Sequence, residues 1–359
     1  MPDPEVAPVQ ASATSRCGVL LINLGTPDSP RTRDVRRYLR EFLSDPLVLD
    51  MPGPLRRALL ELVILPFRPR RSARAYASIW GEGGSPLLRN SRALRDALAA
   101  RLGDGYAVEL GMRYGQPSLA QALAALASRE VSRVIVVPLF PQLTRSTTGS
   151  ALERLHGLAA RLPHAPPLQS VPPFYAHPEF VGALAAVLAP ALESFPADHL
   201  LMSYHGLPER HLHRADPSGE HCLQRPDCCQ IRCPSQESCY RAQCLTTSRA
   251  LAGALGLPPD RWSTAFQSRL GPAAWIRPQT TAVLPTLAQR GVRRIAVVCP
   301  SFVADCLETL EEIGLRAREQ WMELGGEDFL LLPCLNAEPR WVAGLAKIVL
   351  DVQAKSVST

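Results

Sequence analysis

Residues 200–208 read LLMSYHGLP, and residues 19–27 read VLLINLGTP. Each segment is an apolar run that predicts a buried strand, and each ends at a glycine that is followed two residues later by a proline. A second pair repeats in the same order, because residues 133–141 (RVIVVPLFP) and 294–302 (RIAVVCPSF) both begin with arginine and interrupt a β-branched run with proline. The chain therefore repeats its own outline, once in each half.

The stretches between these strands have helical spacing. Ala- and Leu-rich segments cover residues 91–102, 118–130, 180–193 and 281–290. Continuous Val and Ile runs bounded by turns are typical of strands buried on both faces of a parallel sheet, and strands that alternate with helices indicate an α/β protein. We predict two Rossmann-like, doubly wound domains, each with a four-stranded parallel sheet, and a cleft between them.

Proline-rich and cysteine-rich segments divide the chain. We expect a disordered tail over residues 1–15, a first domain over 16–172 and a second domain over 173–338. The second domain carries a cysteine-rich insertion at 219–243, and residues 339–359 form a C-terminal helix and tail.

Composition excludes several classes of protein. The chain has 359 residues, of which 46% are hydrophobic and 20% charged, as in ordinary soluble proteins. No apolar run reaches the roughly 18–20 residues that a spanning helix requires, and the first fifteen residues lack the apolar core of a secretory signal. The net charge of +6 is not accompanied by a stripe of aromatic and basic residues. We therefore expect a cytoplasmic protein that does not bind nucleic acid.

One basic cluster stands out at Arg68, Arg70, Arg71 and Arg74, directly after the apolar residues 59–67. An apolar segment beside a polybasic one can lie on a bilayer surface. The alternative is a helix that packs on its own domain. The 59–74 region is thus a candidate for peripheral contact with the inner face of the membrane.

Polar side chains follow two of the predicted strands. His205 ends the strand at 200–205, and Asp305, Glu308 and Glu312 follow the strand at 295–298. In open parallel sheets, ligands bind beyond the carboxyl ends of the strands, so these residues face what we expect to be one crevice. A neutral imidazole opposite carboxylates can bind a divalent metal or move protons. The alternative is that His205 caps a turn and the acids form a solvated helix face.

Six of the ten cysteines lie close together, at positions 222, 228, 229, 233, 239 and 244. Without a secretory signal, such a cluster favours metal over disulfides. The paired Cys-x2-Cys spacing of structural zinc is absent, and four thiolates suffice for a [2Fe-2S] centre. An iron–sulfur cluster, zinc and unliganded thiols all stay open at this point. The other cysteines lie in apolar runs and are expected to be small core residues.

Several motifs taken together resemble the ferrochelatase family over residues 17 to about 345. They are LINLGTP (21–27), RYLREFLSDP (37–46), GSPL (84–87), GMRYG (111–115), PLFPQ (138–142), SYHG (203–206), FQSRLGP (266–272) and DCLETLEE (305–312). The resemblance implies a fold like that of the class II chelatases, with a porphyrin in the cleft. It also implies the activity of a lyase that inserts Fe²⁺ into protoporphyrin IX to give protoheme, the last step of heme biosynthesis.

The resemblance also implies roles for the polar residues. His205 and Glu308 would form the metal-site pair, Glu312 would lie one helical turn further on the same face, and Asp305 would stand at the mouth of this proton or metal path. Animal members of the family carry histidine where Cys306 stands, and we do not interpret Cys306 as a ligand.

A porphyrin requires an apolar wall and cations for its propionates. The candidates for the wall are Leu24, Tyr76, Ile79, Trp80 and Trp275, and Arg113 is the candidate for a propionate. Taken singly, each is better explained as core or surface structure than as a contact to the porphyrin.

Some bacterial family members place cluster cysteines in an internal segment, and this chain resembles those. Our working ligand set for a [2Fe-2S] cluster is Cys222, Cys229, Cys239 and Cys244, with Cys228 and Cys233 as alternates. We expect a structural or redox-sensing role for it. Three other functions remain open: a coproporphyrin III ferrochelatase of the same family, a chelatase that inserts cobalt into another tetrapyrrole, and a porphyrin- or metal-binding carrier without turnover.

Overall fold

The computed structural model describes residues 16–231, 233–269, 271 and 273–357. The tail expected over residues 1–15 lies outside the described residues, as do the last two residues of the C-terminal tail.

Two four-stranded parallel sheets form the framework, as predicted. The strand order is β2-β1-β3-β4 in the first sheet and β6-β5-β7-β8 in the second, so both halves have the same topology. The strands are β1 (Cys17–Thr26), β2 (Tyr106–Gly115), β3 (Arg133–Pro138), β4 (Leu168–Ser170), β5 (His199–His205), β6 (Trp262–Gln267), β7 (Arg294–Val298) and β8 (Asp328–Leu331).

Helices cover both faces of each sheet, and for this reason the apolar runs of β1 and β5 are almost completely buried. The four segments with helical spacing form α4 (Pro86–Leu102), α5 (Leu119–Ala127), α7 (Pro178–Ser194) and α11 (Thr280–Gln289). The first half also contains α1 (Thr32–Ser44), α2 (Gly53–Ala58), η1 (Leu59–Ile64), α3 (Leu65–Ile79), η2 (Arg145–Gly149) and α6 (Ser150–Ala159). The second contains α8 (Glu209–Ala215), η3 (Cys228–Gln230), α9 (Ser235–Ser238), α10 (Tyr240–Ala254), η4 (Pro259–Arg261), η5 (Glu308–Ala317), α12 (Arg318–Glu323) and α13 (Pro339–Val357).

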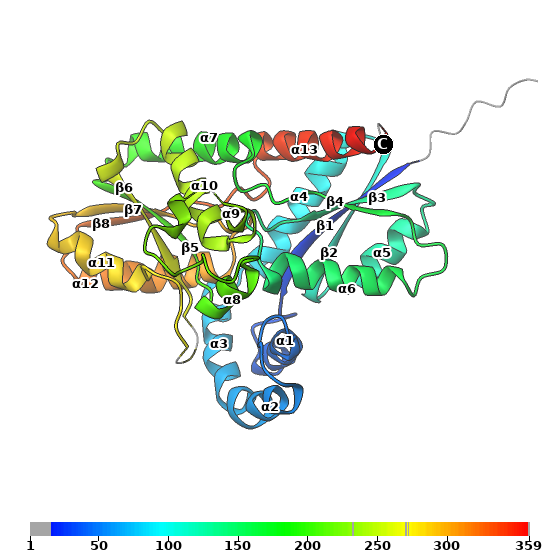
Figure 1. Ribbon diagram of the computed structural model, residues 1–359, viewed down its shortest axis with the longest axis horizontal. Helices are drawn as coiled ribbons and strands as arrows, with labels where there is room; N and C mark the ends of the chain where they lie inside the picture. Colours follow the sequence, from blue (N-terminus) through cyan, green and yellow to red (C-terminus); the bar gives the residue numbers. More distant parts are fainter. Residues whose placement is uncertain (1–15, 232, 270, 272, 358–359) are drawn as a thin grey trace, which may run out of the picture.

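A continuous core joins the two halves. Helix α13 packs against α4 and α7, and Leu94, Phe180 and Trp341 from these three helices belong to one buried cluster. Figure 1 shows α7 and α13 along one side of the molecule and α1–α3 projecting on the opposite side. The boundary that we propose at residues 172–173 falls in the connection between β4 and α7.

The projecting helices have a core of their own. Val35 and Leu39 of α1 pack with Leu65 and Tyr76 of α3, and Tyr114 of β2 attaches this cluster to the first sheet. We call α1, α2, η1 and α3 the lip.

The glycine after each central strand is required by a close approach of the neighbouring strand. Gly25 has φ +118°, and a Cβ there would overlap the carbonyl of Tyr114 in β2. A Cβ on Gly206 would lie 2.7 Å from the carbonyl oxygen of Gln267 in β6. The two halves therefore end their central strands alike, with Leu24 and His205 in equivalent positions.

Candidate functional site

His205 is the last residue of β5, and its main chain is held on both sides. Its N–H donates to Ser301 Oγ (3.2 Å), and its carbonyl accepts a hydrogen bond from the Tyr240 hydroxyl (2.8 Å). Nδ1 lies 2.6 Å from the carbonyl oxygen of Gly206. Because a carbonyl oxygen only accepts, the ring proton of a neutral His205 belongs on Nδ1. Nε2 then keeps a lone pair that can take a proton or bind a metal.

Aromatic side chains flank this imidazole. The ring of Trp275 packs against Gly206, where a Cβ would lie 3.2 Å from Trp275 Cε3. The ring centroid of Phe302 lies 6.4 Å from that of His205. The end of β5 is therefore polar at His205 and apolar around it.

Glu308 begins η5, a π-helix, and faces the lip. Burial and, next, the charge of Glu308 raise the pKa of Tyr76 well above its usual value. Tyr38 is affected in the same direction, again mainly by burial. Burial likewise raises the pKa of the Cys306 thiol, which contacts the Glu308 carboxylate. The carboxylate thus lies at the contact between the two halves of the chain.

Gln267 connects the strand that carries His205 with the helix that carries Glu308. It is the partner of His205 in the pairing of β5 with β6, and its Nε2 donates to the main-chain carbonyl of Glu308 (2.9 Å). Its Oε1 accepts a hydrogen bond from Ser203 (2.7 Å), which fixes the orientation of the amide. The two elements that the sequence analysis assigned to one crevice are therefore adjacent.

Glu312 lies four residues after Glu308 in the same π-helix. Its carboxylate accepts hydrogen bonds from the Ser268 N–H (2.8 Å) and the Ser268 hydroxyl (2.5 Å), and Arg316 lies 3.9 Å away. Ser268 has φ +67°, a conformation that costs a non-glycine residue energy and is found most often near functional sites.

Asp305, which we expected at the mouth of the proton or metal path, is hydrogen-bonded to groups of the protein itself. One carboxylate oxygen accepts hydrogen bonds from the Cys334 N–H (3.2 Å) and the Thr309 hydroxyl (3.4 Å), and the other from Asn336 Nδ2 (2.7 Å). Because the chain's own donors occupy both oxygens, Asp305 acts here as a structural anchor.

Arg113 is also occupied by protein groups. Its guanidinium forms an ion pair with Asp45 and donates to Ser150 Oγ (2.7 Å). The guanidinium carbon also lies 4.4 Å from the ring centroid of Tyr114. Nε and Nη2 of Arg113 are therefore already used by Ser150 and Asp45.

The candidates for the apolar wall fall into two groups. Leu24, Tyr76 and Trp80 border the lip cluster, which also contacts Leu307 next to Glu308. Trp275 forms the second group. It packs against Gly206 in the turn after β5, which we call the His205 turn. Ile79 is half-buried at the end of α3.

Arg68 is a candidate site residue that we assigned from the sequence only to a basic cluster. Its Nη1 is buried and, among the described residues, has no hydrogen-bond partner. Burial lowers the pKa of Arg68, and the nearby Glu308 opposes this effect. A buried cation without a direct partner is costly, so this guanidinium is well suited to bind an anion. The sequence offered one signal for this position: Arg68 precedes the wall candidate Tyr76 by eight residues, which is close to two helical turns.

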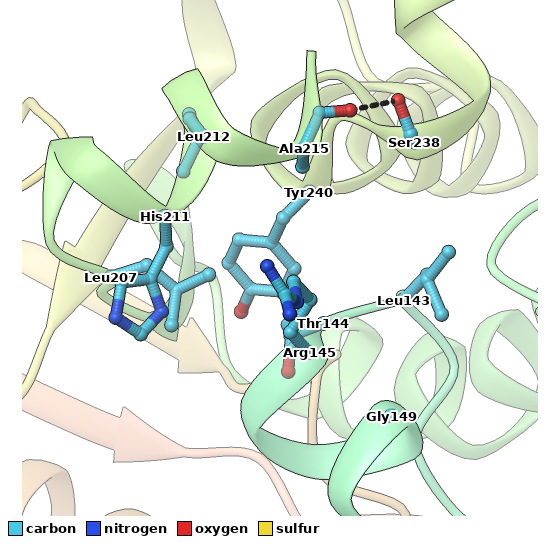
Figure 2. A pocket seen from close by; sticks show the side chains of 10 residues that line it. All are labelled: Leu143, Thr144, Arg145, Gly149, Leu207, His211, Leu212, Ala215, Ser238 and Tyr240. Atoms are coloured by element: carbon cyan, nitrogen blue, oxygen red, sulfur yellow. Dashed lines mark hydrogen bonds between the residues drawn. The ribbon is translucent and has the colours of Figure 1, made fainter. Parts of the chain in front are cut away.

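An apolar pocket lies beside the His205 turn, between η2 and α8. It holds about 650 Å³ of empty space, part of it open to solvent. Figure 2 shows Leu207 and Tyr240 in its wall and two basic side chains, Arg145 and His211, directed toward it. Nε2 of His211 is buried and has no partner among the described residues.

The cysteine segment is organised by one carboxylate. Asp216 accepts hydrogen bonds from the N–H groups of His221 (2.8 Å) and Cys222 (2.7 Å) and from the hydroxyls of Ser218 (2.8 Å) and Ser235 (2.7 Å). These bonds outweigh the effect of burial and lower the pKa of Asp216 strongly.

Four thiols meet next to this carboxylate. Cys239 contacts both Cys222 and Cys229, and the sulfurs of Cys229 and Cys228 are 3.8 Å apart. The structure therefore brings together three members of the working set and the alternate Cys228. Cys244 is fully buried one turn into α10 and contacts Tyr240 instead.

The thiols in this group do not form a recognisable metal site. Over residues 16–357, apart from the three undescribed positions, no three His, Cys, Asp or Glu side chains are grouped to hold a metal ion. Burial raises the pKa of Cys222 to about 11, so this thiol is protonated at neutral pH. The [2Fe-2S] cluster stays a prediction.

The two parallel sheets with the same strand order define the class of protein. Two structures of SirB from Bacillus subtilis, one described as a sirohydrochlorin chelatase in complex with cobalt, superpose with TM-scores of 0.53 and 0.55 and cover 96% of this chain and 98% of theirs. Sequence identity is only 11% and 10%, so these likenesses concern the fold alone. The fold is that of the class II chelatases.

Sequence relatives identify the family. The ferrochelatase family model matches residues 16–352. A ferrochelatase from Azotobacter vinelandii is 51% identical over 92% of this chain and 97% of its own length, and one from Coxiella burnetii is 48% identical over 93% of both chains. The chain belongs to the ferrochelatase family. It is a porphyrin metal chelatase, a lyase of heme biosynthesis, as the resemblance predicted.

Proposed function

We propose that this enzyme inserts Fe²⁺ into protoporphyrin IX, with His205 and Glu308 as the metal-site pair. The observation that carries this proposal is the hydrogen bond between Nδ1 of His205 and the Gly206 carbonyl, because it leaves Nε2 as a base and ligand at the end of β5. The connection through Gln267 supports pairing this base with the carboxylate on η5.

Metal insertion requires two pyrrole N–H protons to leave the macrocycle as Fe²⁺ enters. Nε2 of His205 would accept a proton, while the carboxylate of Glu308 would receive a proton or hold the incoming Fe²⁺. A flat macrocycle hides its nitrogen lone pairs, so a site that binds a distorted ring stabilises the transition state more than the flat substrate. Glu312, held by Ser268, would continue the path four residues further along η5.

The porphyrin would lie between the lip cluster and the His205 turn. Tyr76 and Trp80, whose rings meet edge to face at 6.2 Å, offer an apolar wall. Arg68 is a better candidate for a propionate than Arg113. Its Nη1 is buried and has no hydrogen-bond partner within the described part of the chain, whereas Arg113 is already paired with Asp45.

The pocket beside Leu207 favours protoporphyrin over coproporphyrin III, our second candidate. Most of its wall is apolar, with side chains from Leu143, Leu212 and Ala215. Such a wall suits the vinyl and methyl edge of protoporphyrin IX. Coproporphyrin III carries four propionates, and the lining of this pocket includes two basic side chains to receive them, Arg145 and His211.

The test is to supply Fe²⁺ anaerobically with each porphyrin and to follow the metalloporphyrin spectrum. We expect protoporphyrin IX to be metallated with a higher kcat/KM. Faster turnover of coproporphyrin III would overturn the choice of substrate. His205→Ala should reduce the rate about 100-fold or more, because loss of a required base has that effect. A His205→Ala rate above about a tenth of the parent rate would reject the metal-site assignment.

We also propose that the lip attaches the enzyme to an anionic membrane surface from the cytoplasmic side. The lip patch consists of Leu55, Leu62, Val63 and Phe67, which are between 53% and 76% exposed. Arginines 56, 57, 70 and 71 lie next to these residues in the sequence, and the last three are exposed. Exposed apolar side chains with a basic rim bind bilayers by shallow insertion. Among the described residues, no helix has the length and apolar character to cross a membrane.

Flotation with vesicles tests this attachment. The parent should float with phosphatidylcholine vesicles that contain phosphatidylglycerol, and the double variant Leu62→Ser/Phe67→Ser should remain in solution. Met322→Ser, which removes an exposed apolar side chain from α12, is the matched control and should float like the parent. Equal flotation of the lip variant would reject the proposal.

We further propose that the cysteine segment binds a [2Fe-2S] cluster. Cys222, Cys228, Cys229 and Cys239 are four buried thiols that lie close together, and four thiolates suffice for such a cluster. The described side chains are not arranged as a metal site, so binding the cluster would have to rearrange these thiols. Arg241 Nη1 lies 3.4 Å from Cys229 Sγ and could balance negative charge on the sulfurs. When bound, the cluster would supply a redox-active or structural centre, and its ligands would lose their protons.

Iron and sulfide analysis, together with serine substitutions, tests the cluster. We expect about two iron and two sulfide per chain, with loss of colour in Cys228→Ser. Cys244→Ser distinguishes the two ligand sets, because it should keep the colour if Cys228 is the ligand. Cys17→Ser, in β1, is the control. A colourless protein with stoichiometric zinc would reject the cluster.

A further inference from the structure

Asn336 lies between β8 and α13 and uses every polar position of its side chain. Nδ2 donates to Asp305 Oδ2 (2.7 Å) and to the Cys334 carbonyl (3.2 Å). Oδ1 accepts from the Asp305 N–H (2.9 Å) and from Asn90 Nδ2 (2.8 Å). Asn90 belongs to α4 of the first half, and the other partners belong to the second half. One side chain therefore joins the two halves of the chain.

The backbone of Asn336 is also specialised. Its φ is +47°, in the left-handed region that asparagine adopts more readily than most residues. Its N–H donates to the Val303 carbonyl (2.7 Å). The turn over 303–305 is thus bound by both the main chain and the side chain of Asn336.

The same turn makes an apolar contact with α4. Leu87 packs with Ala304 and Cys306 in a small buried cluster. The hydrogen bond from Asn90 lies one turn further along the same helix. Two independent contacts therefore hold the start of η5 against the first half.

The turn determines where Glu308 lies. Asp305 precedes Glu308 by three residues, and its carboxylate accepts from the Thr309 hydroxyl (3.4 Å) as well as from Asn336. Thr309 Oγ1 in turn accepts from the Cys306 N–H (3.0 Å), which closes the first turn of the helix. If Asn336 moved, Asp305 would lose a hydrogen bond, and the first turn of η5 would be free to shift with it.

We propose that Asn336 is a positioning residue for metal insertion. By joining α4 to the Asp305 turn, it fixes the Glu308 carboxylate relative to the lip, whose helix α3 contacts η5. This inference rests on the role proposed above for Glu308. Asn336 does not contact the residues proposed for the porphyrin wall. We therefore expect it to affect metal insertion through the position of the Glu308 carboxylate and to leave porphyrin binding unchanged.

Two substitutions distinguish the side chain from the backbone. Asn336→Gly keeps the left-handed conformation and removes the amide, whereas Asn336→Ala removes the amide and adds backbone strain. We expect kcat for Fe²⁺ insertion to fall about tenfold in Asn336→Gly, with porphyrin affinity by fluorescence quenching within about threefold of the parent. Asn90→Ala, which breaks only the bond between the halves, should reduce kcat about fivefold. An Asn336→Gly variant with the parent kcat would overturn the inference.

A control and a double variant complete the test. Lys347→Ala removes an exposed ion pair with Glu179, between α13 and α7, and should keep the parent kcat and KM. Asn336→Gly should slow the Glu308→Gln enzyme no further, because both act through one carboxylate. A tenfold loss in both backgrounds would overturn this inference alone. A parent rate in Glu308→Gln itself would overturn the proposed metal pair and, with it, this inference. All rates are compared at a temperature where thermal melts show every variant folded.

Discussion

The hydroxyl of Tyr240 donates a 2.8 Å hydrogen bond to the main-chain carbonyl of His205. Tyr240 follows Cys239 directly, so the cysteine segment reaches the candidate metal site through one side chain. Burial raises the pKa of Tyr240 well above its usual value, which keeps the phenol a neutral donor. We expected a structural or redox-sensing role for a cluster in the cysteine segment, and this bond connects the segment to His205.

Tyr240→Phe should therefore lower kcat without changing the apparent KM for porphyrin. The variant leaves the His205 carbonyl without its partner and frees the imidazole to shift, and we expect a loss of about fivefold. Steady-state kinetics measure it. Tyr106→Phe, which removes a phenolic hydroxyl bonded to Gln353 far from His205, is the control. Parent kinetics in Tyr240→Phe would show that the bond contributes only to folding.

Glu308→Gln should bind porphyrin normally and insert metal slowly. The amide has the shape of the carboxylate but cannot ionise, so proton transfer or Fe²⁺ capture is lost, with an expected reduction of about 100-fold or more. Porphyrin binding by fluorescence and single-turnover metallation separate the two steps. Weak binding combined with normal insertion from bound porphyrin would assign Glu308 a structural role.

Arg68→Met should weaken porphyrin binding without destabilising the fold. The guanidinium is buried and Nη1 has no hydrogen-bond partner among the described residues, so its replacement removes a desolvation cost. We expect an unchanged or higher melting temperature together with a KM for porphyrin raised about tenfold, since a charge-assisted contact is lost. Arg74→Met, on the exposed side of α3, serves as control. A lower melting temperature with an unchanged KM would contradict the assignment.

His199 predicts a pH dependence of stability. Burial and, next, the charge of Arg290 lower its pKa from 6.5 to about 4. Between these values the unfolded chain takes up a proton that the folded protein does not. The stabilisation from the neutral imidazole is therefore complete above pH 6.5 and is lost as the pH falls toward 4, by an amount on the order of 3 kcal/mol.

Urea unfolding at several pH values, with parent and His199→Gln, measures this effect. The glutamine keeps a polar atom near Ser263 Oγ, which now lies 2.9 Å from the imidazole, and it does not titrate. The free energy of unfolding of the variant should fall less between about pH 6.5 and about pH 4. Parallel curves for the two proteins would contradict the expectation.

The framework could be predicted from sequence because its signals are local. The runs at 19–24 and 200–205 are too apolar for anything but buried strands, and the glycine after each follows from a steric contact with the next strand. The proximity of His205 to η5 could also be predicted, because the carboxyl ends of parallel strands lie at the same edge of a sheet.

The details of the site could not be predicted, because they depend on contacts between distant segments. Residues 308–317 form a π-helix, and nothing in their composition distinguishes this from an α-helix. Arg113 is paired with Asp45, and Asp305 is hydrogen-bonded to Asn336, so each partner is distant in sequence. The working ligand set contained Cys229 and kept its neighbour Cys228 as an alternate, and the 3₁₀ turn η3 places their two sulfurs 3.8 Å apart.

The equivalence of Leu24 and His205 has a consequence for how such a protein can arise. A dimer of identical halves would present the same residue to both faces of a flat ligand. It could offer two imidazoles or two isobutyl groups, but never one of each. In a single chain that contains the unit twice, the copies are free to diverge. Here one copy retains a hydrocarbon at the strand end and the other carries a base, so the two sides of a symmetric disc become chemically distinct.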